Sequence, residues 1–241
     1  MSKLSKKINQ AASGEAKQFG FTAIATRGRP ATILCGTRLS DAGKAAEAAA
    51  QGADFVILEG TAKVKGLEEV DASVGVTGDF DAAALDELSK VGVDFVVLTA
   101  SSRAEPLAEE TVGRVLVLDP DLEDTPLRLI GELGLDALVV RAPQLPLTVE
   151  RLLAVRRVSA FTRTALLMDV PPDIDAASLR LLRDSGVAGL VLGDAGKLGA
   201  LKERVAALPV RGKRKEEHTD ALLPATGAGG HEHDDDDWDE D

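Results

Sequence analysis

The sequence predicts an α/β protein built as a single (β/α)8 barrel of the TIM type, followed by a disordered acidic C-terminal tail. The chain has 241 residues, of which 44% are hydrophobic, and this size suits one large domain of that kind. Short runs rich in Val, Ile and Leu alternate with helical stretches, as is typical of a parallel sheet covered on both faces. Eight such runs occur, and eight parallel strands close a barrel.

The expected elements divide the chain into an N-terminal extension at residues 1–30, the barrel at 31–210 and the tail at 211–241. In the extension, Leu4, Ile8 and Ala12 recur at helical spacing. They predict a short helix that closes the bottom of the barrel, and a basic amphipathic helix touching a membrane is the alternative. The eight strands are expected at 31–36, 53–59, 73–78, 93–99, 114–119, 136–141, 164–169 and 188–193.

A fourfold repeat supports this count, because the even-numbered strands begin alike: GADFVILE, GVDFVVLT, GLDALVVR and GVAGLVLG. Each follows a helical stretch that starts near a small polar residue, which can cap the helix, and ends at a glycine suited to a left-handed turn. These glycines are Gly52, Gly92, Gly134 and Gly186. The repeat favours a closed barrel over an open doubly wound sheet, the alternative. The connections after strands 2 and 4 are short, so their helices should be abbreviated.

Charge and composition limit the partners that we expect. The net charge is −12, with four Lys/Arg against eleven Asp/Glu in residues 211–241 and 24 against 29 in the rest. An acidic body repels phosphate backbones, so we expect no nucleic-acid binding. The tail is too polar to bury a core, so it should be disordered and could bind a basic partner. No apolar run suits a membrane span, and the single cysteine, Cys35, agrees with a cytoplasmic location. Homo-oligomerisation remains open.

Acidic residues gather where the expected strands end, which is the active-site face of such barrels. Crowded carboxylates favour a divalent cation, a shared proton or a facing cation such as Arg141. We therefore expect catalysis by Glu59 or Asp169 as the base, with Arg141 holding an anionic group and with Mg²⁺ bound by Asp79 and Asp119. Loop capping is the alternative for each aspartate. The full ring of strand-end residues is Cys35, Glu59, Asp79, Thr99, Asp119, Arg141, Asp169 and Asp194.

The turn after strand 8, GDAGKLGAL, places glycines and Lys197 at a helix start, where exposed amides attract anions. Together with the strand and helix pattern, this turn resembles the phosphate-binding (β/α)8 barrels, a superfamily that includes ribulose-phosphate-binding enzymes and FMN-linked oxidoreductases. The resemblance implies phosphate binding at Gly193, Gly196 and Lys197. Two features depart from it: MDVPPDID at 168–175 replaces a second glycine-rich turn, and Asp194 would repel the phosphate.

Two classes of function follow from these observations. All three histidines, His218, His231 and His233, lie in the tail, so the barrel lacks an imidazole for acid–base work. The first class is an enzyme acting on a small phosphate- or carboxylate-bearing metabolite at the strand ends. The second is a catalytically inactive barrel that serves as a binding or scaffold protein, with the acidic tail engaging a partner.

Overall fold

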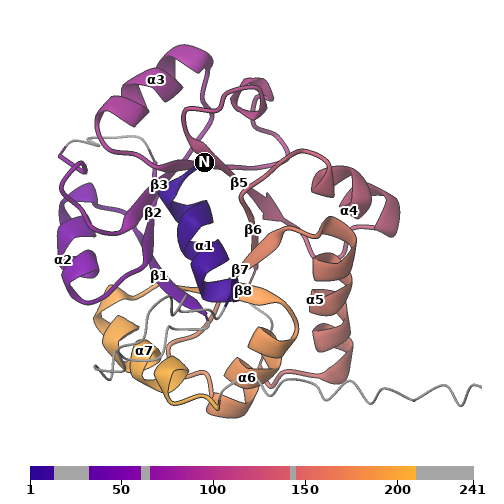
Figure 1. Ribbon diagram of the computed structural model, residues 1–241. Helices are drawn as coiled ribbons and strands as arrows, with labels where there is room; N and C mark the ends of the chain where they lie inside the picture. Colours follow the sequence, from indigo (N-terminus) through magenta and orange to yellow (C-terminus); the bar gives the residue numbers. More distant parts are fainter. Residues whose placement is uncertain (14–32, 61–65, 142–144, 210–241) are drawn as a thin grey trace, which may run out of the picture. The chain divides into compact units, whose positions relative to one another are not determined.

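A computed structural model describes residues 1–13, 33–60, 66–141 and 145–209 of the chain. Within them, eight parallel strands form a closed barrel in sequence order, and the last strand pairs with the first. Figure 1 looks along this barrel. The predicted fold class is therefore confirmed. The strands are β1 (Leu34–Leu39), β2 (Phe55–Glu59), β3 (Ser73–Thr77), β4 (Phe95–Leu98), β5 (Gly113–Leu118), β6 (Ala137–Val140), β7 (Ala165–Asp169) and β8 (Val187–Leu192).

Helices surround the strands on the outside of the barrel (Figure 1). The connection from β4 to β5 holds only the 3₁₀ turn η2 (Glu105–Leu107), and the described part of the connection from β2 to β3 holds no helix. The abbreviated helices were thus predicted correctly, whereas the tail at 211–241 lies outside the described residues. The outer helices are α2 (Ala45–Ala50), α3 (Ala82–Lys90), α4 (Asp124–Gly131), α5 (Val149–Thr162), α6 (Ala176–Asp184) and α7 (Leu198–Ala206), with 3₁₀ turns η1 (Ala42–Lys44) and η3 (Ala195–Lys197).

Local chemistry fixes where these helices begin and end. The carboxylate of Asp81 accepts a hydrogen bond from the amide of Ala84 at the start of α3, and Asp175 accepts one from Ser178 at the start of α6. Such caps satisfy amides that have no partner within the helix. Glycines with positive φ follow α2, α3, α4 and α6, in the conformation that favours glycine after a helix. They are the four predicted ones: Gly52, Gly92, Gly134 and Gly186.

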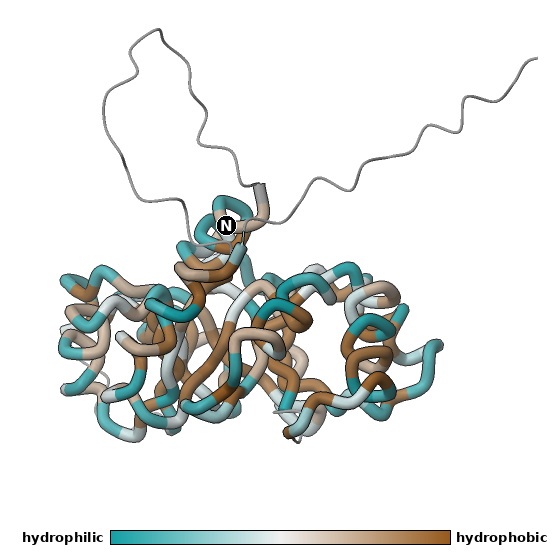
Figure 2. The backbone as a smooth tube through the Cα atoms, turned by 90° about the horizontal axis from the view of Figure 1, so that it is seen from below, coloured by the Kyte–Doolittle hydropathy of each residue, from teal (hydrophilic) through white to brown (hydrophobic). Residues whose placement is uncertain are grey.

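The core has two layers, one inside the barrel and one between the strands and the outer helices. Figure 2 shows apolar colouring concentrated along the strands, while the helices alternate between apolar and polar. Inside the barrel, Phe55 and Phe95 are fully buried. Each ring lies over a glycine of the preceding strand, its partner in the sheet register: Gly36 for Phe55 and Gly75 for Phe95. Side chains therefore fill the interior, and ligands have room only at its ends.

The helix α1 (Lys3–Ser13) lies across the amino-terminal end of the barrel (Figure 1). Its buried residues Leu4 and Ile8 pack against the inner core, together with Ala11, whereas Ala12 is exposed. The carboxylate of Asp94, just before β4, accepts hydrogen bonds of 2.7 and 2.8 Å from the first two amides of the helix. This cap from another part of the chain joins α1 to the strands, as expected for a helix that closes the bottom.

The fourfold repeat explains how α1 contacts the amino ends of the strands. Its aspartates are Asp54, Asp94 and Asp136, each two residues after the repeat glycine. Asp54 accepts a hydrogen bond from the backbone of β1, and Asp136 accepts one from the hydroxyl of Ser2. At β8 the repeat has Ala188 instead, which packs against the inner core where α1 contacts β8. The small apolar side chain of Ala188 leaves room for the apolar face of α1. Among the described residues, no helix is long and apolar enough to cross a membrane.

Candidate ligand-binding site at the carboxyl ends of the strands

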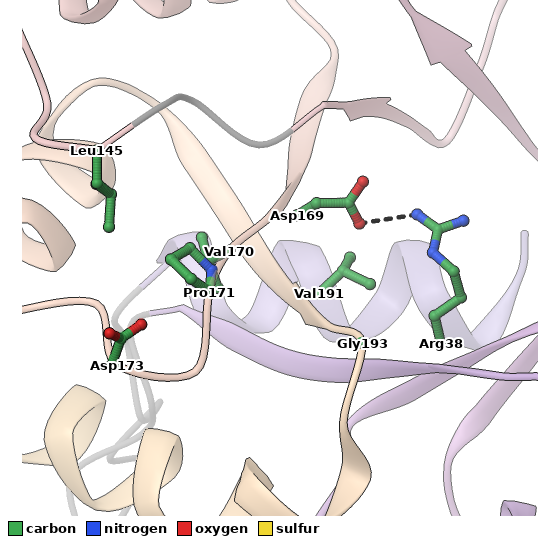
Figure 3. Close-up of a pocket in the computed structure, with 8 residues that line it drawn as sticks. All are labelled: Arg38, Leu145, Asp169, Val170, Pro171, Asp173, Val191 and Gly193. Carbon is green, nitrogen blue, oxygen red and sulfur yellow. Dashed lines mark hydrogen bonds and ion pairs between the residues drawn. The ribbon is translucent and has the colours of Figure 1, made fainter.

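A pocket with a volume of about 620 Å³ lies at the carboxyl ends of β1, β7 and β8 (Figure 3). Barrels of this kind place their functional sites on this face. One side of the pocket is polar, with the guanidinium of Arg38 and the carboxylate of Asp169. The other lining residues are largely apolar: Leu145, Val170, Pro171, Val191 and Gly193, with Asp173 at the edge. The pocket can therefore hold a small molecule with one charged end.

Arg38 is the central polar residue of this site. Its side chain shares the inner face of β1 with Leu34, since alternate residues of a strand point the same way. Its Nη2 lies 2.7 Å from Oδ1 of Asp169, and its Nε lies 3.8 Å from Oε1 of Glu59. The exposed fractions of the side chains are 24% for Arg38, 30% for Asp169 and 57% for Glu59. One largely buried cation thus connects two carboxylates.

A glycine leaves room for the contact between Arg38 and Asp169, whose strands are not neighbours in the barrel. Asp169 ends β7, and β8 lies between β7 and β1 in the barrel. The partner of Asp169 on β8 is the inward-facing Val191, and Gly193 follows it by two positions, just after the strand. A Cβ added at Gly193 would meet no atom within 4 Å, so this part of the pocket is open. The guanidinium of Arg38 crosses this open space to reach Asp169 (Figure 3).

The structure connects Glu59 and Asp169, two of the three predicted catalytic residues, through Arg38. The third, Arg141, is exposed and forms no hydrogen bond or ion pair with any described residue. Arg38 was not among the predicted site residues, because the first strand was expected at 31–36, whereas β1 runs on to Leu39. The alternation of side chains, continued past Gly36, would have placed Arg38 on the inner face.

The same shift in β1 moves Cys35 away from the strand end. Cys35 is buried in the layer between the strands and the outer helices. The pKa of its thiol is raised to about 12, chiefly by burial and also by the negative charge of Asp54, while the positive charge of Lys202 acts in the opposite direction. The thiolate is the reactive form of cysteine, so this side chain is suited to packing and not to nucleophilic attack.

The two predicted metal ligands have partners within their own loops or in the next one. Asp79 accepts a hydrogen bond of 2.8 Å from the backbone of Arg103 and forms an ion pair with its guanidinium at 3.4 Å. Asp119 accepts a bond of 3.1 Å from the amide of Asp121. In the described ranges, no group of three or more His, Cys, Asp or Glu is placed to hold a metal ion. The surroundings of both aspartates fit loop capping better than Mg²⁺ coordination.

The glycine-rich turn after β8 already uses the amides that would face an anion. The carboxylate of Asp194 accepts a hydrogen bond of 2.9 Å from Gly196, and its carbonyl accepts one of 3.2 Å from Lys197. The turn at 41–44, after β1, has the same four residues and the same bond, from Gly43 to Asp41 at 2.9 Å. Each aspartate carboxylate thus accepts a hydrogen bond from an amide of its own turn. Phosphate would need a cation elsewhere in the pocket or a rearranged turn.

Comparison with known proteins identifies the fold. No protein-family model and no curated protein matches the sequence. Among solved structures, a tryptophan synthase from M. tuberculosis in its open form matches with a TM-score of 0.61 at 11% identity, over 86% of this chain and 98% of that one. A mutant tryptophan synthase alpha-subunit from Pyrococcus furiosus matches with a TM-score of 0.54 at 12% identity, over 72% and 96%. The tryptophan synthase complex from the same organism gives 0.53 at 14%, over 71% and 96%.

These similarities agree with the barrel fold described above, because the chain and the matching structures share that fold over most of their lengths. Identities of 11–14% establish a common fold and do not carry an activity from one protein to another. Function has to be argued from the pocket.

Proposed function

We propose that the chain is an enzyme that binds a small phosphate- or carboxylate-bearing metabolite in the pocket at the carboxyl ends of β1, β7 and β8. The observation that carries this proposal is the ion pair of Arg38 and Asp169 at the polar end of the pocket, with the carboxylate of Glu59 3.8 Å from the same guanidinium. Arginine suits planar anionic groups, and carboxylates suit proton transfer. The fold of tryptophan synthase, an enzyme of small molecules, supports it by analogy alone.

The two carboxylates differ in how firmly they are held. Asp169 accepts a hydrogen bond of 2.7 Å from Arg38, whereas Glu59 stands 3.8 Å from the same guanidinium and is 57% exposed. Glu59 is therefore the freer of the two and the better general base or acid, because it can move to the proton of a bound ligand. Asp169 orients Arg38 and can serve as the second carboxylate.

The other predicted residues have places at the edge of this site. Gly193 lines the pocket and keeps its wall open beside Arg38. Lys197 is exposed on the turn that follows, and its ammonium could contact an anion where the amides of the turn cannot. Arg141, just after β6, remains our candidate for contacting the anionic group of the ligand from the rim. These three roles are proposals that substitution can test.

A second function, a binding scaffold without catalysis, is favoured by apolar side chains on the outside of the barrel. Leu129 on α4 and Val149 and Leu153 on α5 are 58%, 75% and 60% exposed, and these two helices pack side by side. Where exposed apolar residues of neighbouring helices form a contiguous patch, that patch is typical of protein–protein contact. A partner at this surface is compatible with an active pocket or with an inactive one.

Ligand screening distinguishes the two functions. A ligand that binds only the folded state raises its melting temperature, so the full chain would be melted with phosphate, acetate and panels of sugar phosphates and organic acids. An enzyme should show a saturable rise with at least one of them. Turnover of that compound should be lost in Glu59→Gln and kept in the control Glu87→Gln, which removes the same charge on the exposed surface of α3. If no anion raises the melting temperature, the enzyme proposal is wrong and the scaffold is favoured.

A further inference from the structure

We propose that Arg38 receives the anionic group of the ligand and that this group replaces Asp169 at the guanidinium. This inference rests on the proposed function and adds to it the residue that selects the ligand and a carboxylate that competes for that residue. Its basis is the ion pair between Arg38 and Asp169 inside the pocket.

The donors of Arg38 are largely unused in the ion pair. A guanidinium carries five N–H donors in a planar fork, which matches a carboxylate or phosphate with two parallel hydrogen bonds. Within the described part of the chain, its one hydrogen bond runs from Nη2 to Asp169, and Glu59 at 3.8 Å is beyond hydrogen-bond length. The remaining donors belong to a side chain that lines the pocket and is three-quarters buried. An incoming anion can therefore form bonds that the protein itself does not supply.

Charge explains why Asp169 must give way. Arg38, Asp169 and Glu59 together carry one positive and two negative charges, so a further anion meets net repulsion if all three stay in place. Taking the position of Asp169 at Nη2 gives the ligand the cation and moves a carboxylate away from it. Asp169 is 30% exposed, so water can solvate its carboxylate after release. The exchange thus needs only a side-chain rotation.

The surroundings indicate what kind of molecule fits. The wall beside Arg38 is formed by Leu145, Val170, Pro171 and Val191, which offer apolar contact to a carbon skeleton. The turn after β8 cannot supply the Gly196 amide, because Asp194 already accepts its hydrogen bond. Arg38, on β1, is consequently the strongest hydrogen-bond donor for an anion among the described residues around this pocket. We infer a ligand with a single phosphate or carboxylate at one end and an apolar body at the other.

The test uses calorimetric titration of the full chain with two probes, inorganic phosphate and acetate, at low ionic strength. Arg38→Gln should weaken binding of the preferred anion by about tenfold or more, since it removes a charge-assisted hydrogen-bond donor. The affinity of Arg38→Lys should lie between those of the wild type and Arg38→Gln, because an ammonium keeps the charge and loses the planar arrangement of donors. Asp169→Asn should tighten binding by roughly threefold to tenfold, because the competing charge is gone. Arg103→Gln, a surface arginine paired with Asp79, serves as the control and should bind like the wild type.

The outcomes separate this inference from the proposed function. If an anion binds the wild type and Arg38→Gln equally well, the anion site lies elsewhere: the enzyme proposal stands and Arg38 is not the receptor. Weaker binding in Asp169→Asn would show that Asp169 assists binding, which would overturn the exchange. If neither anion binds the wild type, Arg38 is not an anion receptor and this inference is wrong, whereas the enzyme proposal is decided by the wider ligand screen. A melting curve of each variant establishes that it is folded, and Arg38→Lys provides the test should Arg38→Gln unfold.

Discussion

The glycine of β3 gives a direct test of how the barrel interior is packed. A Cβ added at Gly75 would lie 2.0 Å from Cε2 of Phe95 and 2.3 Å from its Cζ, whereas ordinary contact starts at 3.4 Å. The ring would have to retreat by about 1.4 Å, which a close-packed interior resists. Phe95 is fully buried inside the barrel, so it cannot turn toward solvent. Gly75→Ala should therefore destabilise the fold.

The magnitude follows from the cost of overpacking. Adding a methyl group to a well-packed core costs about 1–3 kcal/mol, and the close approach here favours the upper part of that range. For a domain of this size, each kcal/mol lowers the melting temperature by about 2–4 °C. We expect Gly75→Ala to lower it by roughly 2–12 °C. Phe95→Leu in the same chain should recover part of the loss, because it removes the ring that the methyl group meets.

Scanning calorimetry of the full chain would measure these changes. Gly199→Ala is the matched control, because Gly199 lies in α7 and a Cβ there would meet nothing within 4 Å. It should leave stability unchanged or raise it by up to about 1 kcal/mol, since alanine favours helix more than glycine does. If Gly75→Ala melts at or above the temperature of the wild type while the control behaves as expected, the packing of Phe95 over β3 is wrong.

Three further predictions concern caps and titration. Asp94→Ala removes the acceptor of two amides at the start of α1 and should cost about 1–2 kcal/mol in urea unfolding, and an unchanged midpoint would mean that this cap adds nothing. Cys35, with its pKa raised to about 12, should react with thiol reagents at pH 8 only after unfolding. Because the folded state holds this proton more tightly, the stability that it adds is present below about pH 8.5 and is lost as the pH rises toward 12. Cys35→Ala should remove this dependence of the free energy of unfolding on pH. The hydrogen bonds from Ser178 lower the pKa of Asp175, so Ser178→Ala should raise it toward 3.8 in a carbon-13 NMR titration, and a pKa that does not move would assign the shift to another cause. A lowered carboxyl pKa adds stability above about pH 4 that is lost as the pH falls, and Ser178→Ala should weaken this dependence.

Much of the fold follows from short stretches of sequence. Seven of the eight strands lie within two residues of their predicted ends, because runs of Val, Ile and Leu between glycines can form little else in a chain of this size. Asp81 and Asp175 cap helices as predicted, since a cap depends only on residues three positions apart. The first strand was misplaced by three residues, because Thr37 and Arg38 are polar and interrupt the apolar run.

The site was predictable only in part. Glu59 and Asp169 were predicted as neighbours at the strand ends because they end apolar runs, and the carboxyl ends of parallel strands share one face. Their connection through Arg38 was not, because Arg38 and Asp169 are 131 positions apart in the chain. Likewise, the sequence offered Asp194 as a repulsive charge near a phosphate, whereas the structure shows its carboxylate bonded to the Gly196 amide.

Local sequence patterns were enough to predict the elements of this protein: alternating strands and helices, the caps and glycines at the helix ends, and a barrel that buries eight apolar strands. Those features depend on interactions between residues close together in the chain, where spacing and side-chain type suffice. Three features became apparent only in the folded chain: Asp94 caps α1, Gly193 leaves space in the pocket, and one arginine connects two carboxylates. Such contacts depend on the register of the strands around the closed barrel, and a shift of one residue would turn each of these side chains to the opposite face.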